Sequence, residues 1–346
     1  MDLIYLKAAM RAWAASGRRP QPGVRLPERA RVLLLRHDRI GDALLSTPIV
    51  DQLARHRPGW TLDLLLADRN LHVYERHPAV ARRWCYRKRP LAALGLVRAL
   101  RRERYDVVVD LMNHRSHTSM VFLKLIRPGI TVGFEEPGCY PFDVPVRARP
   151  KATGHIVERS GDLLRALGCP VRDEELRLSY EPSPASRRRA CGFLEPLRDG
   201  GARLCGVNTS AGGPRRFWGE GNYRELLTRL GREHPGHRFV VFSDPSEVER
   251  ARRIAADLPH VVLAPPGTFD ELAGMVERLD SMITPDTSVA HLCAALNVPC
   301  VAMYLEPKVS RLWFPWGVEY RALYGPGDVD TIPLEEVLQA WRSLGR

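Results

Sequence analysis

The chain has 346 residues, of which 45% are hydrophobic and 27% charged, so it is long enough and apolar enough for a globular protein with two cores. No segment approaches the roughly 18 uninterrupted apolar residues of a membrane span, and the first residues lack the apolar core and cleavage site of a signal peptide. We therefore expect a cytoplasmic protein. The seven cysteines are scattered without metal-ligand spacing, which favours reduced core residues and predicts no metal site.

The formal net charge is +12, and such a basic surface attracts polyanions. The basic residues are spread along the chain, are mostly arginine, and accompany no nucleic-acid-binding motif. We therefore expect no nucleic-acid partner. The excess charge fits a solvated surface, an anionic membrane face or an acidic acceptor.

Residues 1–29 form a basic arm. Its apolar residues recur at helical spacing with cations between them: Leu3, Ile4, Leu6, Met10 and Trp13, with Lys7 and Arg11. Two interpretations stay open. The helix lies on an anionic membrane, which would make the protein peripheral at the inner membrane, or it docks on its own domain.

Strand and helix patterns alternate over residues 30–180, which predicts a parallel sheet covered by helices. The expected strands cover residues 30–36, 61–66, 105–111 and 130–134, and the expected helices cover 43–53, 91–102 and 155–167. A segment rich in proline, serine and arginine follows at 181–189, and we interpret it as a linker between domains.

The alternation restarts over residues 190–328 and predicts a second domain of the same kind. Its expected strands cover residues 204–209, 237–243, 261–264, 281–285 and 299–304, with helices over 222–233, 269–278 and 288–296. A final segment, residues 329–346, contains a helical pattern over 333–344.

Polar residues gather where two of the buried strands end. The first such turn runs from His37 to Asp42, and the second from Asp286 to His291. Ligands bind at the carboxyl ends of the strands in open α/β sheets. In the second turn Thr287 or Ser288 can cap the following helix, whose free N–H groups and dipole then suit a phosphate or diphosphate.

Four motifs occur in an order and spacing that resemble one known family. They are Arg36-x-Asp38-Arg39-Ile40-Gly41-Asp42 with Thr47-Pro48, Tyr105-Asp106 to Asp110-Leu111, the loop Thr209–Trp218, and Pro285-Asp286-Thr287-Ser288-x-x-His291-Leu292. Over residues 31–318 the chain resembles the ADP-heptose:lipopolysaccharide heptosyltransferases, glycosyltransferase family nine. The resemblance implies a GT-B fold, in which two Rossmann-like domains with parallel sheets face a central cleft. It also implies that the helix over 333–344 returns to the N-terminal domain.

The resemblance implies a role for each candidate residue. Asp42 would be the catalytic base, and Arg216 would pair with the donor's phosphates where the family usually has lysine; Arg215 is the alternative for that contact. The other residues implied to bind the nucleotide sugar are Thr209, Ser210, Asp244, Asp286, Thr287, Ser288 and His291. On the acceptor side they are Arg36, Arg39, Gly41, Asn113 and Arg115. No cofactor is implied beyond the ADP-sugar donor.

These inferences predict an inverting transferase that moves heptose or a related sugar from an ADP-sugar to a lipopolysaccharide core or another glycan. Its partners would be the nucleotide sugar and a glycolipid or glycan acceptor at an anionic membrane face. Two alternatives stay open. One is the same fold with another nucleotide-sugar donor, and the other is a protein that binds anionic surfaces or nucleic acid without catalysis.

Overall fold

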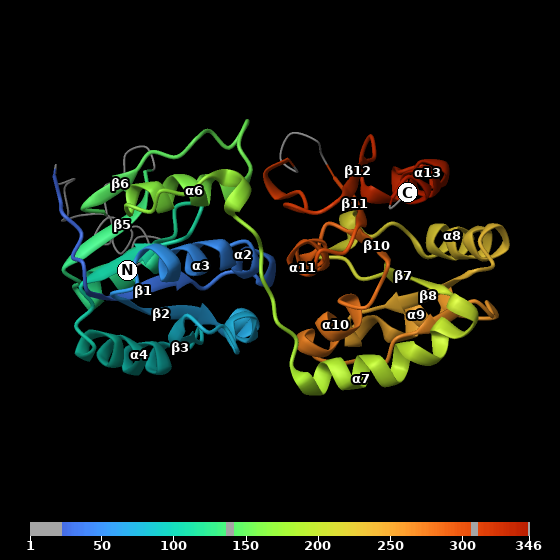
Figure 1. Ribbon diagram of the computed structural model, residues 1–346, viewed down its shortest axis with the longest axis horizontal. Coiled ribbons are helices and arrows are strands. Elements are labelled where there is room, and N and C mark those ends of the chain that lie inside the picture. Colours follow the sequence, from blue (N-terminus) through green and yellow to red (C-terminus); the bar gives the residue numbers. More distant parts are fainter. Residues whose placement is uncertain (1–22, 136–141, 306–310, 345–346) are drawn as a thin grey trace, which may run out of the picture. The chain divides into compact units, whose positions relative to one another are not determined.

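The computed structural model describes residues 23–135, 142–305 and 311–344, so most of the arm predicted over residues 1–29 lies outside the described residues. The chain divides into two compact units, Met1–Leu176 (unit 1) and Arg177–Arg346 (unit 2). Each unit contains a sheet with helices on both faces (Figure 1). This layering is the one that alternating strands and helices predict.

Unit 1 is built on a six-stranded sheet in which neighbouring strands are parallel. Its strands are β1 (Ala30–Arg36), β2 (Trp60–Ala67), β3 (Val80–Tyr86), β4 (Val107–Asp110), β5 (Ile130–Phe134) and β6 (Val144–Val146). Its helices are α2 (Ile40–Leu44), α3 (Thr47–His56), α4 (Pro90–Arg102), α5 (His117–Ile126) and α6 (Ile156–Ala166), with short 3₁₀ helices η1 (Asp68–Tyr74) and η2 (Asp173–Glu175).

The central strand β1 is buried on both faces, because residues 32–35 have no solvent-accessible surface. Leu33 and Leu35 pack into one cluster with Leu100 of α4 and Phe122 of α5. Side chains alternate along a strand, so the intervening residues face α3 and α6, which pack against each other. A continuous apolar run is what a parallel strand covered on both faces requires.

Unit 2 is also a parallel six-stranded sheet. Its strands are β7 (Arg203–Asn208), β8 (His237–Phe242), β9 (Val261–Leu263), β10 (Ser281–Pro285), β11 (Cys300–Tyr304) and β12 (Tyr320–Tyr324). Its helices are α7 (Pro184–Leu194), α8 (Glu220–Glu233), α9 (Val248–Ala255), α10 (Phe269–Val276), α11 (Ser288–Leu296) and α13 (Leu334–Arg342). The short 3₁₀ helices are η3 (Glu195–Gly201), η4 (Pro214–Arg216), η5 (Pro245–Glu247), η6 (Arg311–Trp313) and η7 (Val329–Thr331).

The two sheets share one strand order. In unit 1 the strand order is β3-β2-β1-β4-β5-β6. In unit 2 the order is β9-β8-β7-β10-β11-β12, which is the same when the strands of each unit are numbered from the first strand of that unit. This is the order of the Rossmann fold, in which the direction of winding reverses between the first and fourth strands. The fold predicted from the sequence, two Rossmann-like α/β domains with parallel sheets, is thus confirmed.

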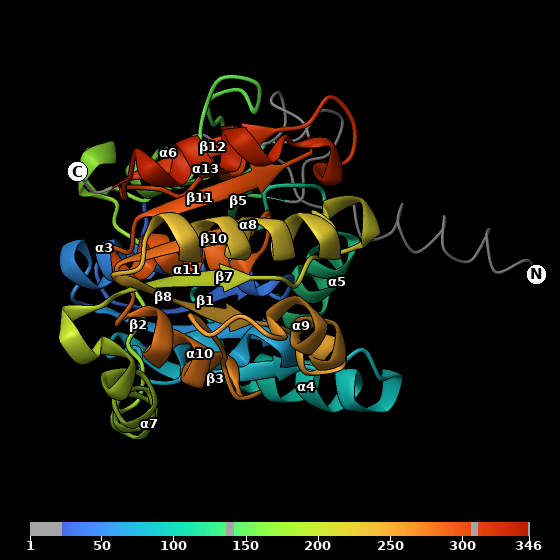
Figure 2. The same ribbon diagram turned by 90° about the vertical axis from the view of Figure 1, so that its right-hand side faces the viewer.

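The C-terminal helix differs from the expectation that the segment 333–344 returns to the N-terminal domain. α13 packs on α8, β11 and β12 of its own unit, and Figure 2 shows α8, α9 and α13 on the same side of that sheet. Trp341 belongs to the unit 2 core, and its Nε1 donates to Ser281 Oγ at 3.1 Å. The apolar face of the helix is buried by the sheet that directly precedes it in the chain.

The predicted linker at 181–189 is also corrected, because most of it is helical. The unit boundary falls after Leu176, and α7 begins at Pro184. Ser183 Oγ accepts a hydrogen bond from the Ser186 N–H at 2.9 Å, and proline occupies the first helical position. Serine as N-cap followed by proline is a helix start, so the composition that suggested a linker marks a helix N-terminus.

The strands that the sequence pattern missed are β3, β6 and β12, all at sheet edges. β3 shows the reason. Arg82 is exposed, and no residue of the strand is fully buried. An edge strand does not need the uninterrupted apolar run that identifies a central strand.

Candidate functional site

The candidate residues lie at the point where each sheet reverses its winding. In unit 1 the turn that contains Asp42 follows β1, and the turn that contains Asn113 follows the neighbouring strand β4. In unit 2 the loop with Arg216 follows β7, and the turn with Asp286 follows its neighbour β10. Sheets of this kind bind ligands in the crevice beyond the carboxyl ends of two such neighbouring strands, which are β1 and β4 in unit 1 and β7 and β10 in unit 2.

Asp42 lies half-buried in the first turn of α2. The turn is braced by Asn70 of η1, whose Nδ2 donates to the Arg36 carbonyl at 2.9 Å and the Arg39 carbonyl at 3.4 Å, while its Oδ1 accepts from the Ala67 N–H at 2.8 Å. These contacts fix the backbone between β1 and α2. The sequence analysis did not identify Asn70, because only tertiary contact brings it to this turn.

The Asp42 carboxyl is poised to take up a proton near neutral pH. Burial raises its pKa to about 6, and the neighbouring Asp38 carboxylate adds to this effect. The guanidinium groups of Arg36 and Arg39 oppose the rise. A carboxylate with this pKa suits general base catalysis, since it is ionised at pH 7 yet binds a proton readily.

The sequence predicts that Arg36 binds the acceptor, but its side chain points into the protein. The side chain is buried, Nη1 donates to Asp38 Oδ2 at 2.9 Å, and Nη2 donates to the Leu111 carbonyl. It therefore ties the first turn to the end of β4. Arg39 remains exposed beside this turn, and Gly41 lies within α2, where its carbonyl accepts from the Leu45 N–H at 3.0 Å.

A buried hydrogen-bonded chain lies beneath the same turn. Ser119 Oγ donates to Asp110 Oδ1 at 3.1 Å and lies 3.1 Å from His37 Nε2. Burial raises the pKa of Asp110 to about 7 and lowers the pKa of His37 to about 4, so the imidazole is neutral at pH 7. The sequence analysis did not predict this chain, whose members lie on three elements.

The turn after β4 supplies the remaining residues predicted on the acceptor side. Asn113 is buried, its Nδ2 donates to the Leu111 carbonyl at 3.4 Å, and its Oδ1 has no hydrogen-bond partner among the described residues. Arg115 is exposed two residues further on. The two side chains thus differ in character: Asn113 is set into the turn and Arg115 reaches solvent.

In unit 2 Asn208, the last residue of β7, links the two polar turns. Its Nδ2 donates to Thr284 Oγ1 at 2.9 Å and Thr287 Oγ1 at 3.2 Å, and its Oδ1 accepts from the Ser210 N–H at 3.1 Å. The buried Thr209 hydroxyl donates to the Phe242 carbonyl at 3.1 Å. Thr209 therefore shapes the loop, and Asn208 is a structural residue that the sequence analysis missed.

Ser210 and Asp244 lie next to each other, because Ser210 Oγ accepts a hydrogen bond from the Asp244 N–H. The Asp244 carboxylate is exposed and accepts from the Ser246 N–H at 2.9 Å and the Ser246 hydroxyl at 2.6 Å. These bonds lower the pKa of Asp244. The carboxylate is therefore ionised at neutral pH, and its position at the end of β8 is compatible with hydroxyl binding.

The structure separates the two candidate arginines. Arg216 Nη2 lies 3.4 Å from Asp286 Oδ2, and Nη1 donates to the Asp286 carbonyl at 3.4 Å. The neighbouring Arg215 turns to Asp328 instead, with Nε at 2.6 Å from Oδ1; Arg215 is exposed and Asp328 is half-buried. Only Arg216 thus lies at the turn that precedes α11.

Thr287 is the N-cap of α11, and its hydroxyl accepts from the Val289 N–H at 3.3 Å. Ser288 is the first helical residue and is half-buried. His291 lies in the following turn of the helix and is only 5% exposed. It therefore lies deeper than the half-buried Thr287 and Ser288 at the start of the helix.

The combined geometry of unit 2 favours an anion. The N-terminus of α11 carries the positive end of the helix dipole, and the Arg216 guanidinium lies at the same place, where it pairs with Asp286. No group of three or more histidine, cysteine, aspartate and glutamate side chains that could hold a metal ion is found in the part of the chain that the structure describes. Within the same ranges no helix is long and apolar enough to cross a membrane.

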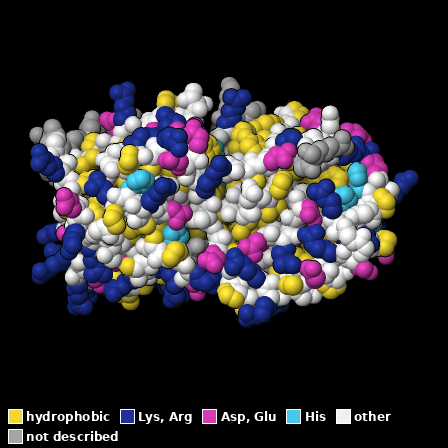
Figure 3. All heavy atoms as spheres, viewed as in Figure 1, with side chains coloured by type: hydrophobic (Ala, Val, Ile, Leu, Met, Phe, Trp, Pro, Cys, Tyr) yellow, Lys and Arg dark blue, Asp and Glu magenta, His cyan; other side chains and the backbone are white. Residues whose placement is uncertain are grey.

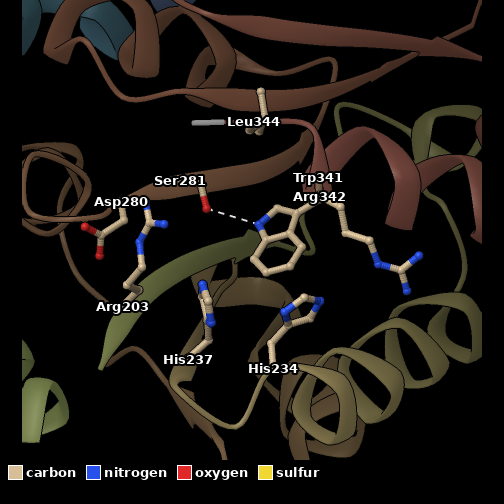
Figure 4. A pocket seen from close by; sticks show the side chains of 8 residues that line it. All are labelled: Arg203, His234, His237, Asp280, Ser281, Trp341, Arg342 and Leu344. Atoms are coloured by element: carbon tan, nitrogen blue, oxygen red, sulfur yellow. Dashed lines mark hydrogen bonds between the residues drawn. The ribbon is translucent and has the colours of Figure 1, made fainter. Parts of the chain in front are cut away.

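A cavity of about 190 Å³ lies at the opposite edge of the unit 2 sheet (Figure 4). It is lined by Arg203, His234, His237, Asp280, Ser281, Trp341, Arg342 and Leu344. Arg203, His237 and Ser281 are the first residues of β7, β8 and β10, whereas the candidate residues follow the last positions of strands. The cavity is therefore separate from the candidate site.

Comparisons with known proteins agree with this arrangement. Lipopolysaccharide heptosyltransferase 3 of Escherichia coli is 23% identical over 290 residues, which cover 80% of this chain and 83% of that protein. The glycosyltransferase of family 9 from Veillonella parvula has a similar structure, with a TM-score of 0.78 at 20% identity over 91% of this chain and 97% of the other. The E. coli heptosyltransferase WaaC with ADP-2-deoxy-2-fluoro heptose gives 0.71 at 21% identity, over 91% and 100%.

The two solved structures share the fold, which is GT-B. The family model described as glycosyltransferase family 9 (heptosyltransferase) matches residues 93–326, which is more than half of the chain. The match includes the turn after β4 and all the candidate residues of unit 2. The chain therefore belongs to glycosyltransferase family 9, the heptosyltransferase family, and is a glycosyltransferase.

Proposed function

We propose that this protein transfers heptose from ADP-heptose to a sugar hydroxyl of a lipopolysaccharide core. The relatives are named as lipopolysaccharide heptosyltransferases, and one related structure was solved with an ADP-heptose analogue. The observation that carries the proposal is that each unit has a polar site at the switch point of its own sheet. One holds a carboxyl with a pKa near 6, and the other holds an arginine at a helix N-terminus.

In the proposed reaction the acceptor oxygen attacks the anomeric carbon of the heptose with inversion. The Asp42 carboxylate accepts the proton of that hydroxyl as the new C–O bond forms. The bond between the anomeric carbon and the diphosphate oxygen breaks, and ADP leaves with the electron pair. Arg216 and the N–H groups at the start of α11 stabilise the charge that gathers on the diphosphate.

The donor site of this proposal consists of Arg216, Ser210, Asp286, Thr287 and Ser288. In the structure Arg216 pairs with Asp286, and we infer that the diphosphate takes over this guanidinium while Asp286 turns to donor hydroxyls. Asp244 is ionised and suits a ribose hydroxyl. Neither the donor nor its departure requires a metal ion in this mechanism, since the arginine and the helix supply the positive charge.

The acceptor is proposed to be a glycolipid. Arg39 and Arg115 are the exposed cations at the turns of unit 1 and suit its acidic groups. Such an acceptor is anchored in a membrane, so we propose that the enzyme works peripherally at the cytoplasmic face.

A transfer assay tests the proposal. The full chain is incubated with a deacylated lipopolysaccharide core and ADP-heptose, and product is measured by mass spectrometry, with UDP- and GDP-sugars as competing donors. We expect product with the ADP-sugar alone. Product from another nucleotide sugar but not ADP-heptose would favour the alternative donor.

Two variants assign the base. Asp42→Asn should lower kcat by at least about 100-fold, the usual scale for a general base, with ADP binding unchanged. Asp68→Asn changes an exposed carboxylate of the same unit and should leave turnover intact. If Asp42→Asn retains more than about a tenth of the wild-type kcat, Asp42 is not the base.

A further inference from the structure

Helix α4 exposes two large hydrophobic side chains. Leu91 is 86% exposed and Leu94 is 48% exposed, and they are the exposed large hydrophobics within the described ranges. The opposite face of the helix packs on the unit 1 core through Leu96, Val97 and Leu100. Other residues of this helix therefore make its contacts with the core, and the two outer leucines are not needed for packing α4 on unit 1.

The outer leucines share one helix face with three cations. Positions 91, 94, 98, 101 and 102 follow helical spacing and project to the same side, because a residue recurs on a face every three or four positions. Arg98, Arg101 and Arg102 are exposed. The face is thus apolar in its first turn and cationic in its last two.

The segment before the helix extends the positive charge. Arg87, Lys88 and Arg89 are exposed, and no acidic residue occurs between positions 87 and 102. Arg87 lies 3.6 Å from Asp68, an exposed and therefore weak ion pair. Figure 3 shows Lys and Arg side chains gathered at the lower left, where Figure 1 places α4.

The three arginines of α4 have no acidic partner among the described residues, unlike several arginines on the surface of unit 2. Arg187 pairs with Glu277 at 2.8 Å, and Arg253 pairs with Glu220 at 2.9 Å. An arginine in an ion pair attracts a distant anion only weakly, because its partner cancels the field. The cations around α4 therefore present a net positive surface, here called the α4 face: Leu91, Leu94, Arg98, Arg101 and Arg102, with Arg87, Lys88 and Arg89.

We propose that the α4 face docks unit 1 on an anionic lipid bilayer. Leu91 and Leu94 enter the boundary between headgroups and acyl chains, and the arginines of the last turns bind lipid phosphates. The long arginine side chains reach the phosphates while the helix lies along the surface. The purpose of this docking rests on the glycolipid acceptor proposed above, but the docking itself requires no sugar.

The combination of side chains favours a bilayer over other anionic partners. A nucleic acid would use the cations but would leave two exposed leucines in water. The core of a protein interface is depleted of charge, whereas here cations surround a small apolar centre on one helix. A bilayer surface offers both an anionic headgroup layer for the arginines and an apolar layer beneath it for the leucines of the α4 face.

Co-sedimentation of the full chain with vesicles tests the inference. Vesicles of phosphatidylcholine are compared with vesicles that also contain phosphatidylglycerol, at low and high salt. The charge variant is Arg98→Gln with Arg101→Gln. Its matched control is Arg252→Gln with Arg253→Gln on α9, which removes the same charge from exposed positions of unit 2. The apolar variant is Leu91→Ser with Leu94→Ser.

The wild type should bind the anionic vesicles and bind them less at high salt. A cation near such a surface contributes about fivefold to partitioning, so the charge variant should bind roughly 25-fold more weakly while the control changes little. The apolar variant should lose binding at both salt concentrations, since apolar contact is not screened.

Three results would overturn the inference: equal binding to neutral and anionic vesicles, equal loss in the charge variant and its control, or no binding by the wild type. A change in oligomeric state on gel filtration of the apolar variant, with vesicle binding kept, would assign the α4 face to a second copy instead. Calorimetry with ADP on every variant keeps this test apart from the proposed reaction. Failure of docking with ADP binding intact would leave the transferase mechanism standing.

Discussion

At the scale of single residues, the Asp42 carboxyl is controlled by the charges around it. Burial and the Asp38 carboxylate raise its pKa to about 6, and Arg36 and Arg39 limit the rise. A base works only when ionised, so a raised pKa removes activity at acidic pH. We expect kcat/KM to rise with pH through a midpoint near 6 and then to level off.

Changing Asp38, whose carboxylate raises the pKa of Asp42, tests whether Asp42 sets the acidic limb of the pH–activity profile. Asp38→Asn removes a like charge but keeps an oxygen that can accept from Arg36, so the Asp42 pKa should fall and the acidic limb of the pH–activity profile should move to lower pH. The pH dependence of kcat/KM measures this. Asp42→Asn, which removes a half-buried carboxylate with a raised pKa, should unfold no earlier than the wild type at pH 7. An unchanged midpoint in Asp38→Asn would contradict the assignment of the limb to Asp42.

Asn70 is a positioning residue for the same turn. Asn70→Ala removes the amide that braces the Arg36 and Arg39 carbonyls, so Asp42 should lose its fixed position. We expect kcat to fall by about 10- to 100-fold, with ADP affinity unchanged and the acidic limb displaced. Asn222→Ala is the control, because Asn222 braces the Trp218 carbonyl in unit 2 in the same way. Equal effects of the two variants would show a general loss of stability instead.

At the scale of elements, α13 belongs energetically to unit 2. Trp341 is buried in that core, so Trp341→Ala should lower the free energy of unfolding by about 3–5 kcal/mol. Arg342→Ala on the same helix removes only an ion pair with Glu233 in which both side chains are about one-third exposed, and it should cost less than about 1 kcal/mol. Urea denaturation of both variants measures the difference. A loss below about 1 kcal/mol for Trp341→Ala would mean that α13 does not depend on this contact.

At the scale of the whole molecule, the division into two units predicts where each ligand acts. ADP bound to the native state should stabilise the protein, by about 2.7 kcal/mol at a hundredfold excess over Kd. Arg216→Gln should reduce this gain more than Arg215→Gln, because only Arg216 lies at the α11 turn. Thermal melts with and without ADP measure both. Equal losses in the two variants would reassign the phosphate contact.

Much of the architecture follows from the sequence alone. Central parallel strands must be apolar on both faces, so the apolar run of β1 predicts a buried strand, β4, β7 and β10 are predicted as strands too, and the polar turns after β1 and β10 mark the ligand edge of each sheet. The sequence pattern misses β3, β6 and β12, because these three edge strands carry no such run. The start of α7 resembles a linker in its composition, because serine and proline occur both in linkers and at helix starts.

Only the tertiary structure decided which of the candidate side chains face the site. Arg36 and Arg39 stand three positions apart, yet one is buried against the Leu111 carbonyl and the other is exposed. Arg215 and Arg216 are neighbours that turn to different aspartates. Sequence spacing places a residue on an element, but the direction of a long side chain depends on partners that the fold brings from elsewhere in the chain. For the same reason Asn70 and the chain from Asp110 through Ser119 to His37 could be found only once β1, β4, η1 and α5 were packed together.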